Sequence, residues 1–578
     1  MKLIAIYDGH NSSAAYMEDG EVKFAIQEER LSRVKNAGGF PRLAIEEILK
    51  RRNLKITGID AFVFVGRTSA YDLVSREAVL EKYAKFFDPR IDVFQFIINR
   101  FKKLVKKAIR YESSAYYDKI AAIRKKPLLA MGADDKKISF IDHHLCHAAA
   151  AAYGWGKNER IAVVTADSAG DGLSGRVWLF NDGELLPQAD IGAADSIGRL
   201  YSLVTYYLGM APMEHEYKIM GLAPYSEKSS QAREIADYFH GLFEHNHGGL
   251  TYKRRIGIEP VYNFGERLRK FLAFRRFDNI SAGLQLFTEE FVSEWIKNIM
   301  IALRADKIAL GGGLFMNVKL NKRIMELPGV KDMFVFPSCG DESNVFGALY
   351  VYWHQKTGQL PKPLSDYYLG GDFSEPEIKS AIERHDFKNC RVKHQKLDGI
   401  EAKVAELLSR KKIVARFDGR MEFGARALGN RSILANPFDP SSVKTINLMI
   451  KSRDFWMPFA PSLLEGNRYI KNPKGVKAPY MVLTFDVPEI YADKLTSVTH
   501  PYDNTCRPQE VNKEWNPKYW QVIDEFKKLT GESIVLNTSL NLHGFPVVYA
   551  PQDALFVFDN SGLEYLVLGD YLVEKIKN

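Results

Sequence analysis

The chain has 578 residues, which is more than one hydrophobic core usually accommodates, so we expect at least two domains. Its 46% hydrophobic and 26% charged residues are typical of a globular protein, and no apolar run of about 20 residues predicts a transmembrane helix. The net charge of +9 fits an anionic ligand as easily as a nucleic acid, but the sequence has no compact nucleic-acid motif. The four cysteines include no Cys-x-x-Cys pair, which argues against a disulfide framework and a cysteine-based zinc site. The first residues lead into a strand without a signal-peptide pattern, so we expect a cytoplasmic protein.

Two similar patterns occur in the first half of the chain. Strand 3–8 leads into the polar loop 8–13, and strand 161–166 leads into the polar loop 167–172. Each loop is followed by another strand and an Asp-Gly turn. Such a duplication is typical of actin-like ATPase folds, in which small residues let backbone amides approach phosphate and aspartates can hold a cation. Two ordinary hairpins with glycine turns would give the same pattern.

A histidine pair lies between these two patterns. A predicted strand over 138–141 is followed by Asp142 and an alanine-rich segment, which favours a helix. Because residues four apart share one helix face, His143 and His147 point the same way and can bind one transition-metal ion. Packing of both rings against the preceding strand is the alternative, and this motif alone does not decide between them.

Further candidate residues follow in the same half. The loop after strand 307–310 is glycine-rich, which suits close approach of a nucleotide, although a plain tight turn would look the same. The segment 214–225 predicts a loop that lines a cleft, and a polar loop precedes the helix expected after residue 344. The candidates in these three segments are Gly311, Gly312, Gly313, Asn317, Lys218 and Asp341. Residues 100–110 predict a basic amphipathic helix with a solvated face, and membrane or acceptor docking is the alternative.

The second half begins at a proline-rich boundary near residue 362. Its most basic segment interleaves glycines with arginines and lysines, which favours a phosphate pocket over a solvated helix face. A hydroxyl- and amide-rich loop after strand 533–536 could donate further hydrogen bonds to an anion. The candidate residues of this half are Arg416, Arg426, Arg431, Lys444, Lys451, Arg453, Ser539 and Asn541.

Taken together, these motifs resemble the O-carbamoyltransferase family, which includes nodulation-type and antibiotic-tailoring carbamoyltransferases. The resemblance extends over nearly the whole chain and departs from the family pattern at Ala425 and Ser343, where proline and glycine are usual. It implies an α/β protein with a duplicated actin-like (ASKHA) domain over residues 1–362 and a YrdC-like α/β domain over residues 363–578. It is carried by Asp8-Gly9-His10, His143-x-x-x-His147, Asp167 with Asp171-Gly172, Tyr217-Lys218-x-Met220-Gly221-Leu222-Ala223-Pro224-Tyr225, Gly340-Asp341, Glu422-Phe423-Gly424-x-Arg426-Ala427-Leu428-Gly429-x-Arg431, Lys451-x-Arg453 and Ser539-x-Asn541.

The resemblance also implies a chemistry. The family uses ATP with Mg²⁺ to make carbamoyladenylate from carbamoyl phosphate, and transfers the carbamoyl group to a hydroxyl of a small-molecule acceptor. The second domain would bind carbamoyl phosphate and ATP through its eight candidate residues. In the first domain, His10 would be the base, and Lys218, Gly311, Gly312, Gly313 and Asn317 would contact the nucleotide.

A divalent metal would be held by His143, His147, Asp167 and Asp341, with Fe(II) favoured and Mn(II) or Zn(II) as alternatives. The resemblance implies no nucleic-acid or membrane partner, is compatible with a homodimer, and leaves the acceptor open. An actin-like small-molecule kinase and an enzyme similar to tRNA threonylcarbamoyl transferases are the alternative functions. The kinase has no need of the histidine pair, and the fused basic cluster disfavours the tRNA enzyme.

Overall fold

Contacts between residues divide the chain into two compact units. The computed structural model describes residues 1–68, 75–88, 114–246 and 248–576. The first unit comprises Met1–Lys23 and Asn36–Leu364, and the second comprises Phe24–Lys35 and Ser365–Asn578. The basic helix predicted for residues 100–110 lies outside the described residues. Within the described part of the chain, no helix is long and apolar enough to cross a membrane.

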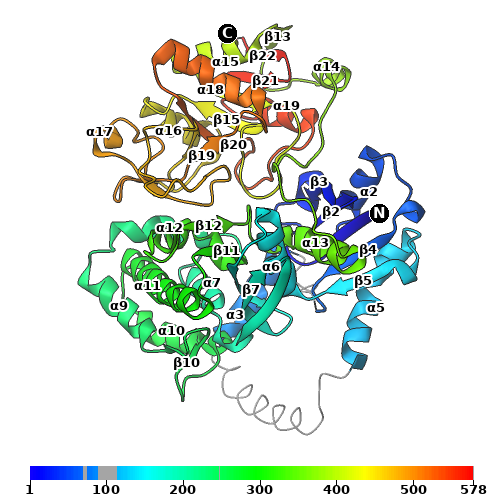
Figure 1. Cartoon of the computed structure of the whole chain (residues 1–578). Helices are drawn as coiled ribbons and strands as arrows, with labels where there is room; N and C mark the ends of the chain where they lie inside the picture. Colours follow the sequence, from blue (N-terminus) through cyan, green and yellow to red (C-terminus); the bar gives the residue numbers. More distant parts are fainter. Residues whose placement is uncertain (69–74, 89–113, 247, 577–578) are drawn as a thin grey trace. The chain divides into compact units, whose positions relative to one another are not determined.

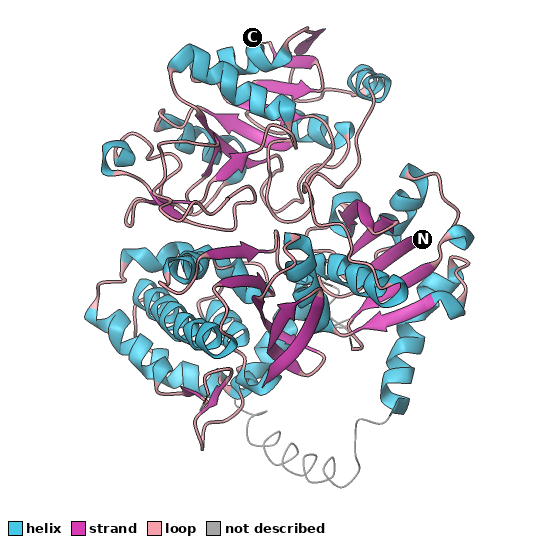
Figure 2. Cartoon of the chain, viewed as in Figure 1, coloured by secondary structure: helices cyan, strands magenta, loops and turns pink. Residues whose placement is uncertain are grey.

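The first unit contains two five-stranded sheets with the same strand order. The first sheet runs β3-β2-β1-β4-β5 and the second runs β8-β7-β6-β11-β12. The central strand of each sheet has the same two neighbours. In the first sheet, β1 pairs antiparallel with β2 and parallel with β4. In the second sheet, β6 pairs antiparallel with β7 and parallel with β11. The predicted duplication is therefore confirmed by the strand order, and the unit has the actin-like arrangement. Figure 2 shows its strands in magenta and its helices in cyan. The strands are β1 (Lys2–Tyr7), β2 (Ser13–Glu18), β3 (Glu21–Gln27), β4 (Ala61–Val65), β5 (Ile138–Ile141), β6 (Ile161–Gly170), β7 (Leu173–Asn181), β8 (Glu184–Gly192), β11 (Lys307–Gly311) and β12 (Asp332–Val335).

Two helices pack against each other at the centre of this unit. Helix α13 (Asn344–Thr357) packs on β1 and β4, and helix α6 (His143–Trp155) packs on β6 and β11 (Figure 1). The two helices approach closely because Gly347 has no side chain. A Cβ atom at that position would lie only 1.7 Å from the carbonyl oxygen of Cys146. This helix pair therefore fixes the start of α6 relative to the loop before α13.

Several of the remaining helices of the first unit pack on the two sheets: α2 contacts β2, α7 contacts β6 and α12 contacts β12. The long helix α11 packs against α9, α8 and α12. A small hairpin of β9 (Phe243–His245) and β10 (Tyr252–Arg254) precedes α10. The helices are α2 (Arg42–Arg51), α3 (Arg76–Phe86), α5 (Ser114–Ala130), α7 (Ile197–Tyr207), α8 (Glu216–Leu222), α9 (Ser230–His240), α10 (Gly265–Leu272), α11 (Phe277–Leu303) and α12 (Val318–Glu326).

The second unit is a separate α/β domain built on one eight-stranded sheet. Its order is β13-β22-β21-β14-β15-β20-β16-β19. Helices α15 and α18 pack together on this sheet and form an apolar core with it that includes Val404, Phe526 and Val535. Helices α14 and α19 form a second pair. The elements are α14 (Glu375–Arg384), β13 (Val392–Lys396), α15 (Ile400–Ser409), β14 (Val414–Phe417), β15 (Arg431–Ala435), α16 (Ser441–Ile446), β16 (Ala460–Leu464), β17 (Phe485–Asp486), α17 (Glu489–Ala492), β18 (Thr505–Cys506), β19 (Gln509–Val511), α18 (Pro517–Thr530), β20 (Ile534–Ser539), α19 (Pro551–Asp559), β21 (Tyr565–Leu568) and β22 (Tyr571–Lys575).

One short segment of the N-terminal region belongs to this second unit. Phe24–Lys35 contains the end of β3 and helix α1 (Glu28–Ser32), although the residues on both sides of it belong to the first unit. The backbone N–H of Ala25 donates to the carbonyl oxygen of Leu369 at 3.0 Å. The sequence assigned residues 1–362 to a single domain and contained no sign of this exchange.

Candidate metal centre and anion site

The histidine pair is positioned by the first turn of α6. The side chain of Asp142 caps the helix by accepting a hydrogen bond from the backbone N–H of Leu145 at 2.9 Å. The helix ends at Gly156 in the left-handed conformation. Both His143 and His147 are buried on the same side of the helix, with ring centroids 4.8 Å apart. The predicted helix and the shared face of the two histidines are thus confirmed.

Two carboxylates from distant parts of the chain meet the two imidazoles. Asp167 lies on β6, and Asp341 begins a 3-10 turn, Asp341–Ser343, that leads into α13. Nε2 of His143 lies 3.2 Å from Oδ2 of Asp167, and Nε2 of His147 lies 3.2 Å from Oδ1 of Asp341. One donor atom from each of the four residues lies within 4.8 Å of the other three. Two imidazole nitrogens and two carboxylate oxygens form a donor set suited to a divalent transition metal.

The charges of this cluster favour a cation between the carboxylates. Burial alone would lower the pKa of His143, but the carboxylates of Asp341 and Asp167 outweigh it and raise that pKa to about 9. Burial would raise the pKa of Asp167, but hydrogen bonding to the two imidazoles holds it well below its usual range. Without a metal, the cluster therefore retains a proton on an imidazole, and a metal ion would replace that proton.

The third histidine of the segment has a different environment. The imidazole of His144 is fully buried, and its Nδ1 lies 2.9 Å from Oγ1 of Thr165. Burial, with the neighbouring His143 and His147, lowers the pKa of His144 to about 3. It is therefore a neutral packing residue beside the candidate ligands.

Tyr7 connects the metal cluster to His10. Burial and the charge of Asp341 raise the pKa of Tyr7 well above its usual value, so its hydroxyl stays protonated. This hydroxyl donates to Oδ2 of Asp341 at 2.7 Å and lies 3.2 Å from Nδ1 of His10. The oxygen of Tyr7 can then accept a hydrogen bond from Nδ1–H of His10, which leaves the lone pair on Nε2. This tautomer is the one a base acting through Nε2 requires.

The other aspartates of the two predicted loops have structural partners. Asp8 forms a buried ion pair with Arg124, whose Nη2 lies 2.7 Å from Oδ1 of Asp8. Asp171 accepts hydrogen bonds from the backbone N–H groups of Arg67, Thr68 and His143. Among the loop aspartates that the sequence suggested as cation ligands, Asp167 alone joins the four-residue cluster.

The glycine loop after β11 packs closely against the elements of the metal cluster. A Cβ atom at Gly311 would lie 2.8 Å from the carbonyl oxygen of His147, and one at Gly313 would lie 3.0 Å from Oδ1 of Asp167. Gly312 has a φ of 101°, and a Cβ there would lie 2.3 Å from the carbonyl oxygen of Ala166. The glycines thus allow close approach of protein backbone, and they place the loop directly beside Asp167.

Two other candidates for nucleotide contact lie on helices. Asn317 caps α12 by accepting from the N–H of Leu320, and its amide pairs with that of Gln285. Lys218 lies in α8, so the prediction of a loop over 214–225 was wrong. Helix α8 packs against α7 and α11, so Ile219–Leu222 are all buried, and this tertiary packing stabilises the helix although the segment has no simple amphipathic pattern.

The second unit brings part of the predicted basic cluster together. The ammonium group of Lys451 donates to Oδ1 of Asn541 at 2.8 Å and to Oγ of Ser539 at 3.2 Å. Arg453 donates from Nη2 to Oγ1 of Thr538 at 3.0 Å. Burial, together with the charges of Arg453 and Lys35, lowers the pKa of Lys451 well below its usual range. The Lys-x-Arg and Ser-x-Asn motifs therefore meet at the end of β20.

Arg507 belongs to this cluster and was missed from the sequence. It lies between β18 and β19, outside the glycine-rich basic segment from which the other arginines were predicted. Burial, with the charges of Arg426 and Arg453, lowers the pKa of Arg507 well below its usual range. Its Nε is buried and has no hydrogen-bond partner among the described residues. Clustered guanidinium groups with a buried, unpartnered donor favour an anion.

Two predicted arginines direct their Nη groups to acceptors inside the unit, although Nε of Arg431 is buried without a hydrogen-bond partner among the described residues. Arg416 pairs with Asp418 at 2.6 Å and donates to the carbonyl oxygen of Gly429. Arg431 is fully buried, donates to the carbonyl oxygen of Asp418 and stacks 3.7 Å above the ring of Phe417. These guanidinium groups stabilise the loop that carries Arg426. Lys444 is exposed on α16.

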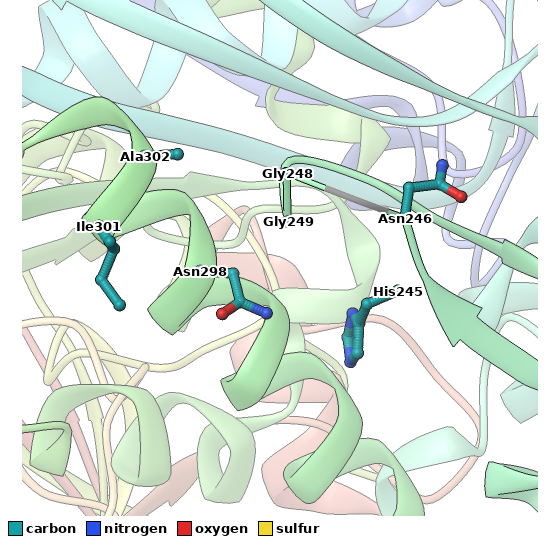
Figure 3. Close-up of a pocket in the computed structure, with 7 residues that line it drawn as sticks. All are labelled: His245, Asn246, Gly248, Gly249, Asn298, Ile301 and Ala302. Carbon is teal, nitrogen blue, oxygen red and sulfur yellow. The ribbon is translucent and has the colours of Figure 1, made fainter.

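A cavity of about 600 Å³ lies elsewhere, between the β9–β10 hairpin and the end of α11 (Figure 3). Its described lining residues include none of the residues predicted for a site. They are His245, Asn246, Gly248, Gly249, Asn298, Ile301 and Ala302.

Comparison with known proteins agrees with the motifs. The model described as Carbamoyltransferase N-terminus matches residues 2–350, and the one described as Carbamoyltransferase C-terminus matches residues 405–575. The chain belongs to the carbamoyltransferase family. The family predicted from the motifs is thereby confirmed, and the chain is a carbamoyltransferase-family enzyme.

Relatives of this carbamoyltransferase include nodulation proteins. Nodulation protein NolNO of Sinorhizobium fredii is 30% identical over 571 residues, which cover 98% of this chain and 79% of the relative. Nodulation protein NolO of Bradyrhizobium diazoefficiens is 32% identical over 439 residues, which cover 75% of this chain and 79% of the relative. Among solved structures, T. kodakarensis HypF gives a TM-score of 0.31 at 10% identity and covers 61% of this chain and 48% of its own.

Proposed function

We propose that this carbamoyltransferase is an ATP-dependent O-carbamoyltransferase that acts on a hydroxyl of a small-molecule acceptor. The convergence of His143, His147, Asp167 and Asp341 carries the proposal, because a kinase of small molecules needs no such donor set. The cation cluster of the second unit supports it, because both carbamoyl phosphate and ATP are anionic. NolNO and NolO are named as nodulation proteins, and the acceptor of the present chain is left open by that similarity.

The second unit is proposed to be YrdC-like and to form carbamoyladenylate. One molecule of water balances the exchange: carbamoyl phosphate and ATP give carbamoyladenylate, phosphate and pyrophosphate. Lys451 and Arg453, which adjoin Ser539 and Thr538, are the proposed contacts of the transferred anion. Arg426 and Arg507 extend the same cluster. Arg416 and Arg431 are proposed to act through the backbone of the loop, because their Nη1 groups donate to the carbonyl oxygens of Gly429 and Asp418.

The first unit is proposed to transfer the carbamoyl group. The acceptor oxygen bonds to the carbamoyl carbon, the bond from that carbon to the AMP oxygen breaks, and Nε2 of His10 takes the hydroxyl proton. Tyr7 holds the required tautomer of His10 through Nδ1. The loop Gly311–Gly313, beside Asp167, is the proposed place of the adenylate.

The metal ligands would be His143, His147, Asp167 and Asp341, with Fe(II) preferred. A divalent ion bound there would act as a Lewis acid on the carbamoyl carbonyl and would hold the adenylate phosphate. The partly buried carboxylate of Asp341 keeps its orientation through the hydroxyl of Tyr7.

The experiment that tests this function omits the acceptor. The chain is incubated with carbamoyl phosphate and ATP, phosphate and pyrophosphate are measured, and carbamoyladenylate is detected by mass spectrometry. We expect all three products with ATP, and no adenylate when ATP is replaced by an analogue whose α,β-bridging oxygen is replaced by a methylene group. Absence of phosphate release and of adenylate would reject the proposal, and consumption of ATP only with a hydroxylated acceptor would favour the kinase. A panel of hydroxylated metabolites, screened for the gain of one carbamoyl group, then identifies the acceptor.

A further inference from the structure

The segment Phe24–Lys35, called the exchanged segment below, belongs to the second unit. Three consecutive charged residues of this segment are buried. Glu28, Glu29 and Arg30 are 9%, 6% and 4% exposed, respectively. Burial of charges costs free energy even when they are paired, and apolar residues of similar size often stabilise a fold as well. The burial of this helix turn therefore indicates a role beyond packing.

The guanidinium group of Arg30 holds the loop that carries Arg426. Its Nη2 donates to the carbonyl oxygen of Gly424 at 2.7 Å, and its Nη1 pairs with Oε1 of Glu29 at 2.7 Å. Nη2 also donates to Oε1 of Gln27 at 3.0 Å. Arg30 is thus oriented by two residues of its own segment and fixes a carbonyl two positions before Arg426.

The rest of this loop is held by residues that follow Leu364. Carbonyl oxygens of Ala427, Leu428 and Gly429 accept hydrogen bonds from Asn537, Gln509 and Arg416, respectively. These contacts all lie after Arg426. Before Arg426, the backbone N–H groups of Met421 and Phe423 donate to the carbonyl oxygens of Gly371 and Tyr367. The contact from Arg30 adds an anchor at Gly424, which is closer to Arg426 in the sequence than either of these.

A second arginine of the segment holds the other loop of the anion site. Arg33 donates from Nη1 to the carbonyl oxygen of Val547 at 2.8 Å. The adjacent loop orients Asn541, whose Nδ2 donates to the carbonyl oxygen of Phe545 at 2.9 Å. Asn541 in turn accepts from Lys451.

We infer that Arg30 is a positioning residue for the anion site: by fixing the carbonyl of Gly424, it holds Arg426 beside Arg507 before the anion binds. Like charges repel, so an anchor at Gly424 opposes the movement of Arg426 away from the other guanidinium groups. Holding the cations in place in advance lowers the cost of binding the anion. The inference rests on the proposed function, in which this anion is carbamoyl phosphate or ATP.

The test uses the full-length chain with Arg30→Lys, and with Arg42→Lys as the matched control. Lysine keeps the positive charge beside Glu29 but cannot replace the paired donors of the guanidinium. The side chain of Arg42 is exposed on helix α2 and pairs with Glu46. In the phosphate-release assay we expect Arg30→Lys to raise the KM for carbamoyl phosphate about tenfold, with kcat within about twofold and no change for the control.

A double-mutant cycle separates positioning from general loss of structure. If Arg30 acts through Arg426, Arg30→Lys combined with Arg426→Lys raises KM by less than the product of the two single effects. The inference is overturned if the two substitutions raise KM independently, so that the double variant shows the product of the single effects. It is also overturned if Arg30→Lys leaves KM unchanged. If Arg30→Lys does not fold, Glu29→Gln enters the same cycle, with an expected rise of about threefold because the guanidinium loses its ionic partner.

Inorganic pyrophosphate separates failure of this inference from failure of the proposed function. Its binding, measured by calorimetry, needs the anion site but no chemistry. Wild-type chain that binds pyrophosphate without releasing phosphate from carbamoyl phosphate would reject the proposed function. The ratio of the Kd values of wild type and Arg30→Lys for pyrophosphate would still decide the role of Arg30: about tenfold supports it, and equal values overturn it.

Discussion

The hydroxyl of Tyr7, on the first strand of the chain, donates a 2.7 Å hydrogen bond to Oδ2 of Asp341, just before helix α13. The other oxygen of that carboxylate faces Nε2 of His147 at 3.2 Å. One phenol therefore orients a candidate metal ligand and also adjoins Nδ1 of the candidate base His10. A change at Tyr7 should therefore affect both metal binding and carbamoyl transfer, and the two effects can be measured separately.

Removing this hydroxyl should weaken the metal site without destroying it. Tyr7→Phe keeps the ring and loses the hydrogen bond to Asp341, so we expect metal affinity to fall about tenfold. Carbamoyl transfer should fall further, because His10 loses the partner that sets its tautomer. Metal titration and transfer assays at saturating metal check the two effects separately. Full transfer activity at saturating metal would show that Tyr7 does not act through His10.

Removing one imidazole should abolish metal binding and leave the second unit active. We expect His143→Ala to lose bound metal and to reduce carbamoyl transfer by more than about 100-fold, while carbamoyladenylate still forms. Elemental analysis and the acceptor-free assay measure these quantities. The control is His354→Gln, because His354 lies at the far end of α13 and pairs with Glu184. Metal retained by His143→Ala would contradict the ligand assignment.

Anion binding by the second unit should take up protons. Burial, with Arg453 and Lys35, lowers the pKa of Lys451 well below its usual range, so the free site holds its proton less firmly than a lysine in water does. A bound phosphate favours the ammonium form and raises that pKa, so affinity should increase as pH falls toward the pKa of the free site. Calorimetry of pyrophosphate binding in buffers of different protonation enthalpy measures the uptake.

The matched variant for this linkage is Lys451→Arg. Arginine stays charged at every accessible pH, so it should bind the anion without this proton uptake. Equal proton uptake by wild type and Lys451→Arg would assign the linkage to another group.

Gly347 in α13 and Gly358 directly after this helix should respond very differently to alanine. At Gly347 a Cβ would lie 1.7 Å from the backbone oxygen of Cys146, which cannot move without displacing α6. We expect Gly347→Ala to destabilise the chain by more than about 3 kcal/mol and to release the metal. Gly358, at the end of the same helix, has a φ of 68° and open space around it, so Gly358→Ala should cost about 1 kcal/mol. Urea unfolding compares the two, and similar midpoints would contradict close packing of the helix pair.

The sequence predicted those parts of the candidate metal site whose residues belong to a recognisable local motif. The spacing of His143 and His147 sets a shared helix face. The strand before Asp167 was recognised by its match to the first strand of the duplicated pattern, although β6 continues to Gly170 and includes Asp167, where the sequence predicted a loop. Such features depend on neighbours in the chain, so they can be recognised without a structure.

The features that the sequence did not reveal depend on distant neighbours. A guanidinium group in a basic segment can contact a ligand or other residues of the protein, and the sequence does not distinguish the two. The guanidinium group of Arg416 contacts the carboxylate of Asp418 and the carbonyl oxygen of Gly429. Arg507 carries no motif of its own and joins the cluster only through the packing of the sheet. Glu28–Arg30 are charged residues that become buried, which runs against the usual preference of these residue types. No local pattern predicts these outcomes.

The exchanged segment Phe24–Lys35 also limits how this protein can be divided. A gene fragment that begins at Ser365 encodes every strand of the eight-stranded sheet, yet it lacks the arginine that holds the carbonyl of Gly424. During synthesis on the ribosome, this N-terminal segment is made long before the loops it contacts, and its buried charges stay without those partners until the C-terminal half emerges. Splitting the enzyme into two working polypeptides would therefore require the segment to travel with the second half, fused ahead of Ser365.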